Sequence, residues 1–159
     1  MLIIFCAELE EAVNIKCSKA KIVITGAGLC NVIQTPQIKV KPGDKLINVG
    51  YAGSNVYPVG SVVSPNLVKR FMPSATIEEK ALTLTPCYQQ ALCYTADDFV
   101  ENTRITEVPL IDMELYYLAS IYPQIESLKI VSDNLNLTEY RAADLQESWD
   151  TVNRILNNL

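Results

Sequence analysis

The segment from Ile111 to Asn134, IDMELYYLASIYPQIESLKIVSDN, decides the predicted fold. Two acids flank a methionine at its start, and an apolar helical run follows from Leu115 to Ile121. A β-branched strand from Leu128 to Val131 then leads into a Ser-Asp-Asn sequence. In an open α/β sheet, ligands bind beyond the carboxyl ends of the strands, which is where Asp133 is expected. The segment therefore predicts that Glu114 and Asp133 meet in one crevice.

The same residues also fit a purely structural interpretation. Asp112 is a suitable N-cap for the helix that starts at Leu115, and Ser132-Asp133-Asn134 can form nothing more than a turn. Spacing alone does not separate this interpretation from the functional one.

Length and composition limit the classes of protein to which the chain can belong. Its 159 residues predict a single domain, 1–159, which is long enough to bury about two-thirds of the surface of the unfolded chain. Apolar residues make up 49% and charged residues 19%, which is typical of a globular protein. The net charge of −5 argues against a nucleic-acid partner, because Lys69-Arg70 is a pair and not a basic patch.

Histidine is absent from the sequence, which excludes Ser–His triads, HExxH zinc sites and histidine general bases. Cysteines are odd in number and form no CxxC pair, so we expect neither a disulfide framework nor a metal site. Reduced cysteines indicate a cytoplasmic protein. The apolar opening from Met1 to Ala7 is too short to span a membrane, and no basic region precedes it, so we expect neither a signal peptide nor a membrane partner.

The first half of the chain alternates strands and helices. Leu2–Ala7 is a continuous apolar run typical of a buried parallel strand, and the acid-rich segment Glu8–Asn14 predicts a short helical turn. Lys21–Thr25 predicts a second strand, which leads into the glycine turn of Gly26–Asn31. Lys45–Val49 begins a third strand.

The second half adds strands before returning to helix. Asn66–Phe71 is predicted as a short helix that ends by Pro73, and Ala81–Thr85 and Gln90–Thr95 are predicted as strands. From Thr138 the chain is helical, with an apolar stripe that forms the core side of the last helix, at Leu145, Trp149, Val152 and Leu156. This order predicts a three-layer α/β/α fold with a central mixed sheet.

Four short blocks resemble one protein family, and the first of them is the N-terminal strand with the acids that follow it. I-D-M-E followed by V-S-D-N is similar to the paired signature of the nucleoside phosphorylase superfamily. The stretch INVGYAGSNVYPVGSVVSP resembles the corresponding part of methylthioadenosine/S-adenosylhomocysteine nucleosidases, and TADDFV resembles the family's S-G-D-x-F motif. The chain is short for the family, and Tyr51 stands where the family pattern has a small residue.

The resemblance implies a role for each matched residue. Asp133, held protonated by an enclosed site, protonates the leaving purine. Glu11 activates the attacking water, with Glu10 as the next candidate because the register there is uncertain by one residue. Glu114 accepts hydrogen bonds from the ribose hydroxyls, and Phe99 stacks on the purine. The full set of implied substrate-binding residues is Glu114, Met113, Phe99, Val100, Ser132, Gly53 and Ala52.

The implied activity is hydrolytic cleavage of the N-glycosidic bond of a purine nucleoside such as methylthioadenosine or S-adenosylhomocysteine. Water is the expected nucleophile, because related phosphate-using enzymes commonly have a phosphate-binding arginine in the place of Asn48. No cofactor or metal is required, and the family resemblance predicts a homodimer. Two alternatives remain open: a phosphate-dependent purine nucleoside phosphorylase, and a trimmed, non-catalytic nucleoside-binding protein.

Overall fold

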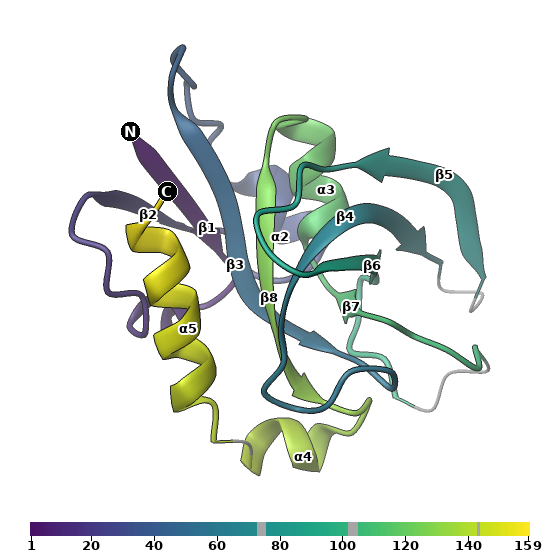
Figure 1. Ribbon diagram of the computed structural model, residues 1–159. Coiled ribbons are helices and arrows are strands. Elements are labelled where there is room, and N and C mark those ends of the chain that lie inside the picture. Colours follow the sequence, from purple (N-terminus) through teal and green to yellow (C-terminus); the bar gives the residue numbers. More distant parts are fainter. Residues whose placement is uncertain (73–75, 102–104, 143) are drawn as a thin grey trace.

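The computed structural model describes residues 1–72, 76–101, 105–142 and 144–159 (Figure 1). Over these residues the strands are β1 (Leu2–Cys6), β2 (Ala20–Ile24), β3 (Lys45–Gly53), β4 (Val62–Phe71), β5 (Ile77–Thr83), β6 (Gln90–Thr95), β7 (Ile111–Asp112) and β8 (Glu126–Asp133). The helices are α1 (Leu9–Ala12), α2 (Leu29–Gln34), α3 (Leu115–Ile121), α4 (Leu137–Ala142) and α5 (Gln146–Asn157).

One mixed sheet contains all of these strands. β2, β1, β3 and β8 run parallel as neighbours. β8 then pairs antiparallel with β4, β4 pairs parallel with β6, and β6 pairs parallel with β7. Because β7 returns to pair with β3, the strands β3, β8, β4, β6 and β7 form a closed circuit. The expected α/β fold with a mixed sheet is confirmed.

Apolar residues cover both faces of this sheet. In β1, Ile3 and Phe5 belong to one buried cluster together with residues of α2 and α3, such as Val32 and Leu118. The alternate residue of the same strand, Ile4, belongs to a second cluster together with residues of α5. Side chains alternate between the two faces of a strand, so α5 packs on the face opposite to α2 and α3 (Figure 1).

The predicted stripe of the last helix lies in the second cluster, where Leu145, Trp149, Val152 and Leu156 are all buried. The helical region after Thr138 consists of two helices, α4 and α5. The strand predicted at Ala81–Thr85 overlaps the end of β5, and the one at Gln90–Thr95 is β6. No helix within the described ranges has the length and apolar character needed to cross a membrane.

The helix predicted at Asn66–Phe71 is wrong, because these residues form the second half of β4. Their apolar spacing fits a helix locally, but the segment pairs with β5 on one side and with β6 on the other. The ladder to β6 shifts register between Pro65 and Leu67, where a proline cannot donate a hydrogen bond. Long-range pairing therefore overrides the local pattern.

Candidate functional site

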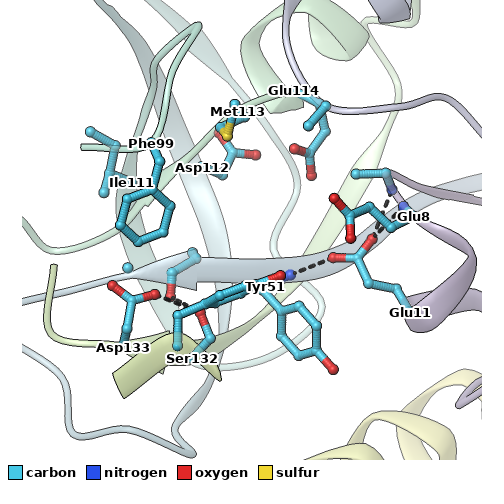
Figure 2. Close-up of a pocket in the computed structure, with 15 residues that line it drawn as sticks. Glu8, Glu11, Tyr51, Phe99, Ile111, Asp112, Met113, Glu114, Ser132 and Asp133 are labelled. Atoms are coloured by element: carbon cyan, nitrogen blue, oxygen red, sulfur yellow. Dashed lines mark hydrogen bonds between the residues drawn. The ribbon is translucent and has the colours of Figure 1, made fainter. Parts of the chain in front are cut away.

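A pocket with an empty volume of about 470 Å³ lies at the carboxyl ends of β1, β3 and β8 (Figure 2). Parallel strands carry their carboxyl ends to the same edge of the sheet, which explains how distant segments meet there. The residues that line it are Ala7, Glu8, Glu11, Ala27, Tyr51, Ala52, Gly53, Phe99, Ile111, Asp112, Met113, Glu114, Ser132, Asp133 and Tyr140.

Eight of the nine site residues expected from the sequence line this pocket; the exception is Val100. Val100 instead packs against a third apolar cluster and lines a smaller pocket beside Phe71 and Met72. Its neighbour Phe99 contributes to both pockets and is 39% exposed. The side chain of Val100 therefore does not reach the main pocket.

Asp133 ends β8 and is held by the turn that follows. Its Oδ1 accepts hydrogen bonds from the backbone N–H groups of Leu135 (2.8 Å) and Asn136 (3.2 Å). The turn requires a φ of 64° at Leu135, a left-handed conformation that costs a non-glycine residue about 1–2 kcal/mol. Such local strain is typical of functional sites, where the surrounding structure compensates for it.

The second oxygen of Asp133 is shared with the neighbouring hydroxyl. Ser132 Oγ lies 2.8 Å from Asp133 Oδ2 and 3.4 Å from the carbonyl oxygen of Ala52. A hydroxyl both donates and accepts. Ser132 can therefore donate to an ionised Asp133, or accept from a protonated one while it donates to Ala52.

Glu11 is buried at the other end of the pocket. Its Oε2 accepts hydrogen bonds from the N–H groups of Ala7 (2.8 Å) and Glu8 (3.0 Å), and its Oε1 accepts one from Tyr51 (3.0 Å). Burial raises the pKa of Glu11, against the opposing charge of Lys129 and these hydrogen bonds. Glu10 is exposed and lines a neighbouring pocket, so Glu11 is the better placed of the two glutamates.

Glu114 lies where β7 leads into α3. Its Oε1 lies 2.6 Å from the Nζ of Lys129 and accepts a long hydrogen bond from Asn48 Nδ2 (3.5 Å). Burial raises the pKa of Glu114 to about 7; Lys129 lowers it, and Asp112 and Glu11 raise it further. The residue expected to contact ribose is therefore paired with a buried cation.

Asp112 accepts a hydrogen bond from the first residue of α3 and pairs with a cation. Its Oδ2 accepts the N–H of Leu115 at 2.9 Å and lies 2.7 Å from Lys129 Nζ. Its Oδ1 accepts the hydroxyl of Thr95 at 2.5 Å. The N-cap position expected for Asp112 is occupied by Glu114, so that interpretation was wrong, although Asp112 still accepts the first N–H of the helix.

Aromatic rings surround the open side of the pocket. Tyr140 on α4 contacts Phe99 and Tyr51, with ring centroids 5.9 and 6.0 Å apart. Tyr51 also packs edge-on against Trp149, whose Nε1 donates to its hydroxyl at 3.0 Å. Tyr51, which stands where the family pattern has a small residue, therefore adds a phenol ring to the pocket and connects the pocket to α5.

Sequence reasoning missed Lys129 and Tyr140. Lys129 is fully buried in the middle of β8. A signal for it existed, because a lysine inside the apolar strand SLKIVS must either reach solvent or meet an acid. Tyr140 gave no signal of its own, since its place in the pocket depends on how α4 packs.

The charged side chains that line the pocket are all acidic. Its lining contains the carboxylates Glu8, Glu11, Asp112, Glu114 and Asp133 and includes no lysine or arginine. Within the part of the chain that the structure describes, no group of three acids, cysteines or histidines has the geometry of a metal site. The site is therefore suited to a neutral or cationic ligand.

No protein-family model matches the sequence, and no curated protein matches it. Solved structures do match the fold over nearly the whole chain. The nucleosidase MTAN of Chlamydia trachomatis has a TM-score of 0.75 at 17% identity, with 99% of this chain and 97% of that chain covered. The 5′-methylthioadenosine/S-adenosylhomocysteine nucleosidase of Helicobacter pylori has a TM-score of 0.70 at 12% identity, with 99% and 96% covered.

A third match shows the same fold in another hydrolase. Futalosine hydrolase of Helicobacter pylori has a TM-score of 0.69 at 13% identity, with 98% of this chain and 94% of that chain covered. The chain therefore has the fold of these nucleosidases and of futalosine hydrolase. The fold is similar to that of methylthioadenosine/S-adenosylhomocysteine nucleosidases, as the motifs predicted.

Proposed function

We propose that the protein hydrolyses the N-glycosidic bond of a purine nucleoside such as methylthioadenosine or S-adenosylhomocysteine. The observation that carries this proposal is the placement of Asp133 at one end of the pocket and of Glu11 at the other (Figure 2). The similar chlamydial protein has been solved bound to MTA, as a variant, and bound to adenine, which supports the choice of ligand.

Asp133 is the proposed general acid. Cleavage of a glycosidic bond requires a proton on the leaving group and passes through an oxocarbenium-like transition state. A protonated Asp133 would transfer its proton to purine N7, while Ser132 accommodates both protonation states through Asp133 Oδ2 and the Ala52 carbonyl. Phe99 and Tyr140 supply aromatic faces beside this end of the pocket, where a base can stack.

Glu114 and Glu11 serve the sugar side. An ionised Glu114 accepts hydrogen bonds from the ribose hydroxyls, and its negative charge stabilises the cationic sugar as that charge develops. Glu11 is held by three backbone N–H groups, which fix the direction of its carboxylate. From that position it would orient the attacking water and accept its proton.

Water is favoured over phosphate as the nucleophile by the charge of the site. A phosphate would enter a pocket that is lined by acids and includes no lysine or arginine in its lining. The buried Lys129 is already paired with two carboxylates. Asn48 is buried behind the pocket, where it bonds to Phe5 and Ser127. Phosphate binding would therefore be opposed by like charges.

The test is a product analysis. The purified protein is incubated with methylthioadenosine, S-adenosylhomocysteine, adenosine and inosine over a titration of inorganic phosphate. We expect free base and free sugar at zero phosphate, with no increase in rate as phosphate is added. The variant Glu11→Gln should lose this release while it still binds nucleoside, and Glu10→Gln serves as the matched control.

The other outcomes identify the alternatives. Sugar 1-phosphate that forms only in the presence of phosphate would show that the protein is a phosphorylase. Nucleoside binding without release of base from any substrate would show a non-catalytic binding protein.

We also propose a single domain that acts as a homodimer in the cytoplasm, with the three-layer form of the fold. The two core clusters on opposite sheet faces support the layers. Large apolar side chains are exposed on α1 and directly after it, on β2 and on α2, at Leu9, Val13, Ile22, Ile24 and Ile33, and such a surface favours association. Sedimentation that shows only a 17.7 kDa monomer at micromolar concentration would refute the dimer.

Cysteines without disulfides suit the cytoplasm, and recovery of the protein in a secreted fraction would contradict a cytoplasmic location.

A further inference from the structure

Lys129 is a buried cation that does not line the pocket. It lies in the middle of β8 with no exposed surface, a position that lysine adopts only when it is paired. Its Nζ lies 2.6 Å from Glu114 Oε1 and 2.7 Å from Asp112 Oδ2. Lys129 therefore acts on a ligand through the carboxylates around it and not by direct contact.

The two oxygens of Glu114 have different surroundings. The hydrogen bonds from Lys129 and Asn48 both end on Oε1. Among the described residues, no hydrogen bond reaches Oε2, and the carboxylate of Glu114 points into the pocket (Figure 2). Lys129 thus fixes one oxygen from behind and leaves the other for a ligand.

We propose that Lys129 is a positioning residue that makes the pocket selective for ribose over deoxyribose, an inference that rests on the proposed function of Glu114. By pairing with Oε1, Lys129 favours the ionised form of Glu114 and directs Oε2 toward the sugar hydroxyls. A charged acceptor forms roughly twice as strong a hydrogen bond as a neutral one. A deoxynucleoside, which lacks one of these hydroxyls, loses that bond.

The charges around Glu114 determine the pH range in which Lys129 makes the pocket selective for ribose. The charged groups that face it are Lys129 on β8, Asp112 on β7 and Glu11 on α1. The nearby thiols Cys6 and Cys93 are neutral, because burial raises the pKa of each. Of the charged groups, only Lys129 favours the ionised form of Glu114, whereas the two acids oppose it.

These opposing influences predict shifts of opposite sign. Burial raises the pKa of Glu114 to about 7, so selectivity for ribose should rise as the pH increases through this value. The midpoint is the pH at which the ribose preference has reached half of its full value. Removing the positive charge with Lys129→Met should move this midpoint to higher pH. Removing the competing negative charge with Asp112→Asn should move the midpoint to lower pH, because Lys129 then pairs with Glu114 alone.

The experiment measures binding rather than turnover. Dissociation constants for adenosine, 2′-deoxyadenosine and 3′-deoxyadenosine are determined by calorimetry between pH 5.5 and 8.5, in an Asp133→Asn background that suppresses cleavage. The dissociation constant of each deoxynucleoside is divided by that of adenosine, and the larger of the two ratios is taken as the ribose preference. We expect Lys129→Met to lower this preference at pH 7.5 by about 10-fold or more, as for loss of a hydrogen bond to a charged group.

Two further variants separate positioning from simple structural support. Lys129→Met in a Glu114→Gln background should change the preference by less than about twofold, because the residue through which Lys129 acts is already altered. Lys45→Met, a change of an exposed lysine on β3, should leave both the preference and its midpoint unchanged. Circular dichroism confirms that each variant is folded.

The proposal is overturned if a folded Lys129→Met protein keeps the preference and midpoint of its parent. If Lys129→Met does not fold, Asp112→Asn decides, and a midpoint that stays in place or moves upward overturns the proposal. Absence of base release by the unmutated protein would refute hydrolysis alone, since the binding ratios remain measurable. Equal binding of adenosine and both deoxynucleosides, or no binding at all, would refute the inference.

Discussion

At the scale of single residues, the site consists of carboxylates whose orientations are fixed by the backbone. Asp133 is held by two N–H groups of its own turn, and Glu11 by three N–H groups from two different segments. Backbone donors cannot rotate away as side chains can, so each carboxylate is oriented before a ligand arrives. Such preorganisation is the main source of electrostatic stabilisation in catalysis.

Asp133→Asn should fold normally and lose nearly all release of base. The amide keeps the shape of the side chain but cannot transfer a proton, and general acid catalysis typically contributes ~10²–10⁴-fold in rate. Initial rates of adenine release from methylthioadenosine test this, with thermal unfolding as the check on folding. Asp98→Asn, the same change at an exposed position near Phe99, is the matched control. A variant that kept more than about half of the rate would contradict the role of Asp133.

At the scale of elements, β3 is the strand against which both ends of the site are built. A Cβ at Gly50 would lie 2.8 Å from Glu11 Oε1, and one at Gly53 would lie 3.1 Å from Asp133 Oδ1. The absence of a side chain at these two positions lets both carboxylates approach the strand closely. β3 thus determines the spacing of the two carboxylates expected to act in catalysis.

Gly50→Ala should impair catalysis more than it impairs folding. The added methyl group displaces the Glu11 carboxylate from its bond to the Tyr51 N–H, and overpacking of this kind costs about 1–3 kcal/mol. Rates of base release and urea unfolding are measured together, with Lys45→Ala at the exposed start of β3 as the control. In a Glu11→Gln background Gly50→Ala should cause little further loss of rate; an additive loss would show that the glycine acts elsewhere.

At the scale of the whole molecule, the closed circuit of strands encloses the ionised groups of the site. β7 and β8, which carry Asp112 and Lys129, are each paired on both sides, and Glu114 is the second residue after β7. Burial there makes the charge state of the site part of the stability of the fold. The pH dependence of unfolding should therefore report on the same residue as the pH dependence of binding.

Stability should fall between pH 5 and pH 7 because of Glu114. Its pKa is about 7 in the folded protein and 4.5 ordinarily, so the folded state holds the proton more tightly. That contribution is fully present below pH 4.5 and is lost as the pH rises through 7. The expected decrease over this range is about 2 kcal/mol.

Urea unfolding at several pH values measures this decrease, and Glu114→Gln should make the curve flatter. The chain has no histidine, so no ordinary histidine titration overlaps this range. The remaining slope should have the same sign, because the pKa of Glu11 is also raised by burial. A wild-type curve that rises with pH over this interval would contradict the assignment.

The sequence by itself determined the features that depend on local pattern. Apolar periodicity located the last helix and its buried stripe, and continuous β-branched runs located the strands of the parallel part of the sheet. The order of four short motifs predicted the fold, and eight of the nine residues expected at the site line one pocket. Local pattern predicts these features because strand, turn and helix preferences act between near neighbours, and because the carboxyl ends of parallel strands meet at one edge of the sheet.

Only the tertiary structure decided the features that depend on pairing between distant segments. The ladders of β4 turned an expected helix into strand, and the packing of α1 placed Glu11 rather than Glu10 in the pocket. The pairing of Lys129 with Asp112 and Glu114 joins residues 17 and 15 positions apart on separate elements. Burial makes such a pairing necessary, yet which acids meet the lysine is determined by the register of the strands, and that register is a property of the whole sheet.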